Sequence, residues 1–411
     1  MALIAAAPTR RSACGSSGLP MAGAKHTRLD EPTPAGSKRQ RPQQFYRPEL
    51  DLLRLLAFLM VWSSHALLAF STLFPRAVLE TLEGAGSCGV PVFFFLSAFL
   101  ITELFRRERC LRGTLQLRSF YVRRALRIWP LYYGVLAVYA VLGLFFHGFR
   151  IEHGRLLASC LMVGNWYLVV HPWISTPMRA LWSISVEEQW YLFWPALHRS
   201  LERGQSLLLC CGVVVLSGGL LLFLAEHAPP ASLYLTAWVN TGVQFQYFAL
   251  GAAAALLLNG RVPGCKRVTR AGLGFAGAAC MLVAAGRCHL KSAETVPSGA
   301  GLVCGYMLAG AGAAALFFAF YGLEQSRCPR MLVRLGQLSF GLYVFHETGF
   351  FIANALSRAA HLPTSRAMVS AEKLLALVLT VLMAWLSYHL WELRFLRLKS
   401  RWAVVRTREA Q

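Results

Sequence analysis

The first apolar segment of the chain combines a cation and an imidazole at a spacing that suits anion binding and proton transfer. Arg54 and His65 lie 11 residues apart. On an α-helix this is about 20° from a whole number of turns, so they would share one face about 16 Å apart along the axis. Asp51 lies one turn before Arg54 and can pair with it. The structural alternative is an arginine that reaches the membrane interface and a histidine that bonds a carbonyl.

Two more arginines stand one helical turn apart. Arg124 and Arg127 end a loop, residues 106–127, that contains eight arginines. Guanidinium groups at this spacing can bind one phosphate group together. The alternative is that the loop is only a topology signal, because basic residues concentrate in cytoplasmic loops of membrane proteins.

A carboxylate opens an aromatic-rich segment in the middle of the chain. Glu187 follows Trp182 and Ser185 in the run Trp-Ser-Ile-Ser-Val-Glu. Such a group can act as an acid or base, orient a histidine or hold a hydroxyl. The alternative is a carboxylate that only stabilises the start of a helix through the helix dipole.

A second histidine lies in a late apolar segment. His346 follows Tyr343 by one helical turn and directly precedes Glu347. Ionisable side chains in a bilayer cost about 2.5–3.5 kcal/mol each on insertion scales, so they are default candidates for function. The alternative is a histidine satisfied by helix packing. We expect Glu392 to pair with Arg394 in a structural role.

The elements that must position these residues are apolar helices. Of the 411 residues, 56% are hydrophobic and 15% charged, and the mean hydropathy is +0.48. A water-soluble fold needs a more polar surface, so the composition predicts an all-α, polytopic membrane protein of about ten helices. The predicted spans are 50–70, 88–105, 129–147, 181–198, 207–225, 238–258, 271–286, 300–322, 338–357 and 374–393.

The net charge of +22 comes from 41 Lys and Arg against 19 Asp and Glu. The basic residues stand between apolar runs, which favours a topology signal over nucleic-acid binding. Ten spans with both termini cytoplasmic place 31 basic residues inside and 9 outside. Residues 156–170 could be an eleventh span or a re-entrant segment. An eleventh span would move two basic clusters outside, so we prefer ten.

Outside these spans the sequence predicts little structure. Residues 1–44 have the composition of a disordered tail, residues 45–400 form one membrane-embedded domain, and residues 401–411 form a short basic tail. The 11 cysteines show no CxxC pair and no metal-ligand spacing with histidine. We therefore expect neither a disulfide framework nor a metal site.

Taken in order, six segments resemble the motifs of the type-3 acyltransferase family of integral-membrane O-acyltransferases. The resemblance covers about residues 47–400 and gains its specificity from the order of the motifs. Ala98 stands where the family usually has glycine, and Glu392-Leu-Arg394 stands where it usually has Glu-Arg-Pro. The matching segments are Arg54 with His65, Gly89 to Ile101, Arg124 to Tyr133, Trp182 to Glu187, Leu335 to His346, and Glu392 to Arg394.

This resemblance implies an enzyme of the inner or plasma membrane that acts within the lipid bilayer. It would move an acyl group, commonly acetyl, from cytoplasmic acyl-CoA to a hydroxyl of a carbohydrate or glycolipid acceptor. Acyl-CoA would be a co-substrate, and no cofactor would be bound permanently. Acyl-CoA is polyanionic, so its nucleotide must dock on a basic surface, which residues 106–127 supply.

On this basis each candidate residue receives an expected role. His65 would take the proton from the acceptor hydroxyl, while an acyl-histidine intermediate is the competing route. Glu187 would orient His65 or position acceptor hydroxyls. Arg54, Arg124 and Arg127 would bind the donor. Supporting roles fall to Asp51, Trp182, Ser185, Tyr343 and His346.

The rival function is a transporter or flippase of a glycan or lipid-linked sugar. Such proteins also place charges near the middle of the membrane, often with broken helices and internal repeats. No repeat is evident in the sequence. Binding of CoA would separate the two functions. The sequence indicates neither the acceptor nor the oligomeric state.

Overall fold

The computed structural model describes residues 45–70, 74–171, 176–290, 296–361, 365–402 and 405. Within these ranges the chain is helical and has no strand, which confirms the all-α class. The predicted tail 1–44 and most of 401–411 lie outside the described residues. The helices are α1 (Pro48–Ser63), α2 (Arg76–Ser87), α3 (Gly89–Arg112), α4 (Leu117–Phe145), α5 (His153–Cys160), α6 (Gly164–Val170), α7 (Trp182–Ser200), α8 (Arg203–His227), α9 (Pro230–Val239), α10 (Thr241–Leu258), α11 (Arg267–Gly286), α12 (Gly299–Phe320), α13 (Arg330–Gln337), α14 (Ser339–Ala359), α15 (Arg366–Ser387) and α16 (Leu393–Ser400).

Short turns complete the architecture. Four 3-10 turns lie at Leu67–Phe70, His147–Phe149, Arg179–Leu181 and Gln325–Arg327, and one π-helical turn, Tyr388–Glu392, joins α15 to α16. Local chemistry explains several helix ends. Pro48 starts α1 because its fixed φ suits the first helical position. Gly113 ends α3 in the left-handed conformation, with φ of 73°.

Seven helical stretches of the described residues are long and apolar enough to cross a membrane: Arg76–Arg112, Leu117–Phe145, Arg203–His227, Pro230–Leu258, Arg267–Gly286, Gly299–Phe320 and Ala367–Ser400. The three other predicted spans correspond to α1, α7 and α14, which are shorter or carry more polar residues. The chain is therefore a multi-pass membrane protein. The count of ten and the cytoplasmic termini stay predictions.

Residues 156–170 fold as parts of two short helices. Cys160 ends α5, and α6 begins at Gly164. At about 1.5 Å per residue, neither helix approaches the roughly 30 Å of a bilayer core. The segment is thus not one continuous span.

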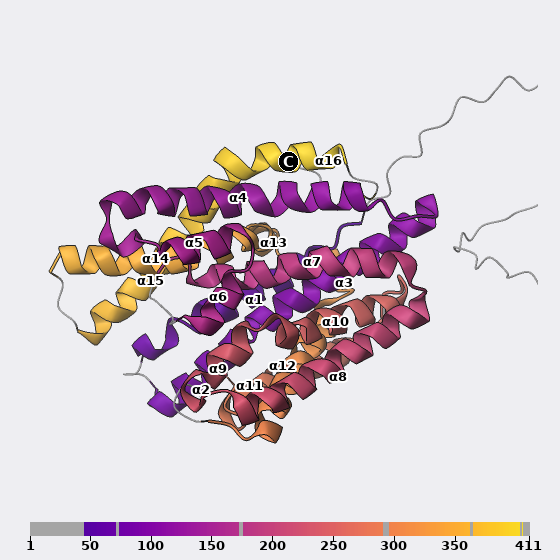
Figure 1. The fold of residues 1–411 in the computed structure, drawn as a ribbon, viewed down its shortest axis with the longest axis horizontal. Helices are drawn as coiled ribbons and strands as arrows, with labels where there is room; N and C mark the ends of the chain where they lie inside the picture. The colour runs from indigo at the N-terminus through magenta and orange to yellow at the C-terminus, as the bar shows by residue number, and fades with distance from the viewer. Residues whose placement is uncertain are drawn as a thin grey trace, which may run out of the picture.

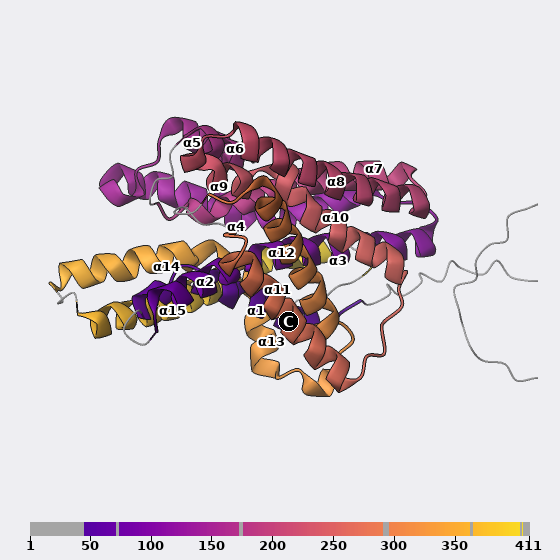
Figure 2. The same ribbon diagram turned by 90° about the horizontal axis from the view of Figure 1, so that it is seen from below.

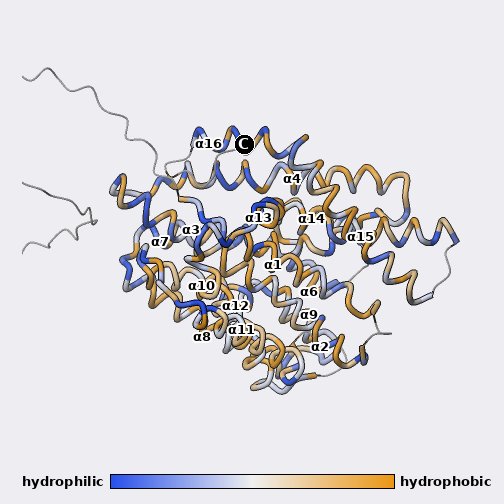
Figure 3. Tube along the Cα trace, turned by 180° about the vertical axis from the view of Figure 1, so that it is seen from behind, coloured by the Kyte–Doolittle hydropathy of each residue, from blue (hydrophilic) through white to orange (hydrophobic). Residues whose placement is uncertain are grey.

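The helices pack as an asymmetric bundle with α1 and α3 at its centre. The helix α3 packs against α1, α10 and α12, while α14 and α15 form an adjoining pair. Figure 1 shows α4 and α16 side by side along the top of the view, and Figure 2 shows α14 and α15 as an adjoining pair on the left. Long hydrophobic stretches run through α4, α8, α14 and α15 (Figure 3). Leu208, Val215 and Leu216 of α8 are more than 70% exposed, as a lipid-facing surface requires.

Small residues allow the central helices to approach closely. A Cβ added to Gly251 of α10 would overlap the carbonyl oxygen of Phe95 in α3. We expect Gly251→Ala to destabilise the protein by about 1–3 kcal/mol because the helices must separate. Gly219→Ala in α8 is the matched control, since nothing lies within 4 Å of its added Cβ. Thermal melting in detergent measures both. A Gly251→Ala protein as stable as the control would contradict this packing.

Candidate functional site

A cavity of about 210 Å³ lies among helices that are distant in sequence. We call it the central cavity. It brings together most of the residues singled out from the sequence. Phe45 and Val405 also line it, so both ends of the described chain lie at the same end of the bundle. Among its lining residues are Asp51 and Arg54 of α1, Arg124 and Arg127 of α4, Ser183 and Glu187 of α7, Tyr343 of α14 and Lys399 of α16.

The lining of the central cavity is cationic. Six Lys and Arg side chains face three carboxylates. The guanidinium of Arg54 donates to Asp51 Oδ1 at 2.8 Å, the pair that their one-turn spacing predicts. Arg124 lies over the ring of Tyr191, with its Cζ 5.1 Å from the ring centroid. Apolar side chains such as Phe93 and Leu100 line other parts of the wall.

Glu187 belongs to the wall of the central cavity, and its hydrogen-bond partners are hydroxyls. Ser97 Oγ donates to Glu187 Oε1 at 2.5 Å, and the hydroxyl of Tyr191 donates to the same oxygen. The carboxylate that contacts His65 is Glu347 instead. The expectation that Glu187 could orient His65 therefore has no support from the geometry, whereas holding a hydroxyl matches its contacts.

The position of His65 also differs from the expectation. The helix α1 ends at Ser63, and His65 lies in the following turn, where its backbone N–H donates to the carbonyl of Trp62 at 3.1 Å. Arg54 and His65 therefore do not share a face of one continuous helix. Arg54 lines the central cavity, whereas His65 lies outside its lining.

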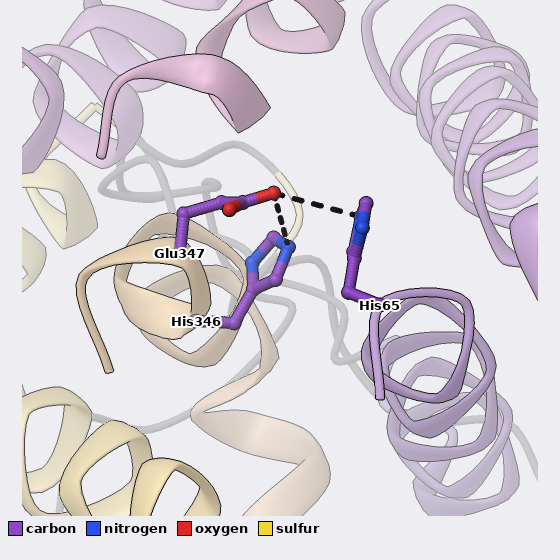
Figure 4. Close-up of side chains that lie close together, drawn as sticks. All are labelled: His65, His346 and Glu347. Atoms are coloured by element: carbon purple, nitrogen blue, oxygen red, sulfur yellow. Dashed lines mark ion pairs between the residues drawn. The ribbon is translucent and has the colours of Figure 1, made fainter. Parts of the chain in front are cut away.

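His65 meets α14 and the segment before α7 in a cluster of four side chains, His65, Arg179, His346 and Glu347, which we call the histidine cluster. Glu347 Oε1 lies 3.6 Å from His65 Nε2 and 3.8 Å from His346 Nε2 (Figure 4). Arg179 donates to both Glu347 oxygens, at 2.8 and 3.1 Å. His346 is buried, while His65 and Arg179 retain 21% and 28% exposure of their side chains.

These contacts determine which nitrogens carry protons. A guanidinium can only donate, so His65 Nδ1 accepts from Arg179 Nη2 at 3.3 Å. In the neutral ring the proton then lies on Nε2, the nitrogen that faces Glu347. His346 Nδ1 lies 2.6 Å from the carbonyl oxygen of Tyr343 and donates to it. The arrangement of carboxylate, imidazole and guanidinium suits general base catalysis with a cation beside the base.

Tyr343 connects the central cavity to the histidine cluster. Its hydroxyl lies 2.6 Å from Ser183 Oγ, and both residues line the cavity. On its other side, its ring centroid is 5.4 Å from that of His346. A molecule in the central cavity would therefore be separated from the cluster by the Tyr343–Ser183 pair.

The histidine cluster also has atoms that could ligate a metal ion. The ligand atoms of His65, His346 and Glu347 all lie within 4.8 Å of one another. However, the Arg179 guanidinium already binds the Glu347 carboxylate. Its positive charge would oppose a second cation at that place. The geometry thus favours an ion-paired cluster.

The remaining predicted residues, Trp182, Ser185 and Glu392, are packed against or bonded to other parts of the protein. Trp182 packs edge-on against Phe94, and Ser185 is completely buried. Both line a second cavity of about 20 Å³ together with Arg179. Glu392 does not pair with Arg394, since its Oε1 accepts from Ser387 Oγ at 3.0 Å. The ten cysteines among the described residues form no disulfide with one another, and Cys14 lies outside the described residues.

Sequence reasoning missed Arg179 and assigned no role to Glu347. Arg179 stands just before a predicted span, in a segment treated only as part of the outer charge count. The position of Arg179 gave little indication of a function, because an arginine at a membrane boundary is common. Glu347 was noticed beside His346, but nothing in its spacing linked it to His65.

The chain is similar in sequence to a known protein family and to several known proteins. A family model described as "Acyltransferase domain" matches residues 47–389. The peptidoglycan O-acetyltransferase OatA of Listeria monocytogenes is 32% identical over 160 residues, covering 37% of this chain and 24% of that protein. "Putative peptidoglycan O-acetyltransferase YrhL" of Bacillus subtilis is 27% identical over 376 residues, covering 84% and 54%.

A third relative, a "Putative O-acetyltransferase" of Staphylococcus aureus, is 28% identical over 227 residues, covering 52% of this chain and 35% of that protein. The chain thus spans about half or less of the length of these curated relatives. No solved structure matches it.

Proposed function

Because this chain belongs to the acyltransferase family whose model matches residues 47–389, we propose that it O-acetylates a peptidoglycan-type carbohydrate, with cytoplasmic acetyl-CoA as the donor. That the chain is a membrane acyltransferase follows from the family and the apolar helices. The donor, the acceptor and the inner or plasma membrane as its location are parts of the proposal.

The observation that carries the proposal is the central cavity with the histidine cluster beside it. A cavity with six cations among apolar walls suits a donor whose nucleotide is polyanionic and whose pantetheine arm is uncharged. Arg124 and Arg127 would bind phosphates, and Arg54 would bind further along the arm. The thioester end would then reach the Tyr343–Ser183 pair, which must move aside for the thioester to meet the histidine cluster behind it.

The acceptor part of the proposal rests on the relatives and on the chemistry of the cluster. Two of the relatives are named for peptidoglycan, a carbohydrate polymer rich in hydroxyls. His65 is half-buried, and its Nδ1 accepts a hydrogen bond from Arg179, which the acceptor must displace. A sugar hydroxyl on that nitrogen would be the group to be acetylated.

The proposed reaction proceeds at His65 Nδ1, after the acceptor hydroxyl has replaced Arg179 Nη2 as the hydrogen-bond donor to this nitrogen. This nitrogen takes the proton of the acceptor hydroxyl while the hydroxyl oxygen attacks the thioester carbonyl carbon. The negative charge of Glu347, 3.6 Å from Nε2, stabilises the imidazolium that forms. Arg179 stabilises negative charge on the reacting oxygen. The carbon–sulfur bond then breaks, and the CoA thiolate takes the proton back from His65.

The proposal predicts that CoA stabilises the protein. We expect millimolar CoA to raise the melting temperature of the detergent-purified protein, because a ligand that binds only the folded state stabilises it by mass action. Arg124→Glu should abolish the increase by reversing a charge in the cavity lining. Arg267→Glu, on an exposed residue at the start of α11, should retain it.

The same preparation tests transfer directly. Radiolabelled acetyl-CoA and soluble peptidoglycan fragments should yield labelled carbohydrate. A protein that neither responds to CoA nor labels the fragments would contradict the proposed donor, and labelling of a different glycan alone would contradict the proposed acceptor.

A further inference from the structure

The C-terminal helix α16 forms part of the wall of the central cavity, although it lies beyond the residues that the family model matches. Leu396, Lys399 and Ser400 of this helix line the cavity, as does Tyr388 in the π-helical turn before it. From these positions we infer that Lys399 binds a phosphate of the CoA moiety, an inference that rests on the proposed function.

Hydrogen bonds from α4 to the residues on either side of α16 establish the level of Lys399 along α4. Trp391 Nε1 donates to the carbonyl of Pro130 at 3.0 Å. Arg123 donates to the carbonyl of Trp402 at 2.9 Å. The C-terminal segment therefore runs antiparallel to α4, with Figure 1 showing the two helices side by side. Lys399 lies one turn before Trp402, so it is level with the turn of α4 that follows Arg123 and contains Arg124 and Arg127.

The π-helical turn at Tyr388–Glu392 influences the orientation of α16 about its axis. A π turn contains one residue more than an α turn, and each residue advances an α-helix by about 100°. The turn therefore changes which face of α16 points toward α4. In the resulting orientation Lys399 is half-buried at the cavity, whereas Arg397, two residues earlier, is exposed and does not line it.

The charges around Lys399 favour an anionic ligand. Arg123 is paired with Glu108 at 3.3 Å, and Arg54 is paired with Asp51. Lys399 and Arg124 add further positive charge to the same lining. The nucleotide of CoA carries phosphate groups at two places, so it can use cations from both α4 and α16.

The test compares charge reversals on the two faces of α16. In purified full-length protein, we expect Lys399→Glu to raise the KM for acetyl-CoA about tenfold, with kcat falling far less, because a charge-assisted phosphate contact becomes repulsive. Lys399→Arg should stay within about twofold of the unmodified protein. Arg397→Glu makes the same charge change on the exposed face and should leave the KM within about twofold.

A KM for Lys399→Glu equal to that of Arg397→Glu would overturn the inference. If Lys399→Glu does not fold, Lys399→Gln is measured instead, and an unchanged KM for that variant overturns it equally. Should the unmodified protein transfer no acetyl group, the proposed function fails. Lys399 is then judged by CoA-dependent melting alone: a smaller increase for Lys399→Glu than for Arg397→Glu supports the phosphate contact, and equal increases refute it.

Discussion

Replacing His65 by alanine is expected to lower the rate of acetyl transfer by about 10²–10⁴-fold, the usual contribution of a general base. The variant removes the nitrogen that we propose takes the proton of the acceptor. CoA binding should be retained, because His65 does not line the central cavity. The measurement is transfer from radiolabelled acetyl-CoA, paired with the CoA-dependent increase in melting temperature.

His227→Ala is the matched control for this prediction, since His227 is an exposed histidine at the end of α8. Its transfer rate should equal that of the unmodified protein. Undiminished transfer by His65→Ala would rule out the mechanism. Label that stays on the protein when no acceptor is present, and that disappears in His65→Ala, would favour the acyl-histidine route over direct attack.

The second large effect is expected at Glu347. Glu347→Gln keeps the shape of the side chain but removes the charge that pairs with Arg179 and faces both histidines. We expect kcat to fall on the order of 10²-fold, because the imidazolium of His65 loses its stabilising carboxylate. The KM for acetyl-CoA should change little, since Glu347 does not line the central cavity.

Two further variants distinguish the loss of the Glu347 charge beside His65 from a general loss of structure. Glu226→Gln makes the same substitution at an exposed residue of α8 and should leave kcat unchanged. Glu347→Asp keeps the charge and should recover part of the rate. If Glu347→Gln raises the KM for acetyl-CoA and leaves kcat intact, then Glu347 acts on the donor and not on His65.

Much of the fold could be predicted because membrane helices are encoded locally. An apolar run long enough to cross a bilayer is visible in the sequence itself, and each of the ten predicted spans corresponds to a helix. The Asp51–Arg54 pair could be predicted for the same reason, since one helical turn separates the two residues. The break between α5 and α6 could not be predicted in the same way, because a short apolar run such as 156–170 is compatible with both a membrane span and a re-entrant segment.

The features of the candidate site also fall into those that the sequence predicts and those that depend on the tertiary structure. The sequence by itself determined the membrane class, the helices, the excess of cations and the type of chemistry that His65 could perform. Only the tertiary structure decided that Arg179 meets His65 across 114 residues and Glu347 across 168. It also placed Glu187 beside Ser97 and ended α1 before His65. Contacts between helices depend on how their faces pack and where each helix stops, and spacing along a single helix contains neither.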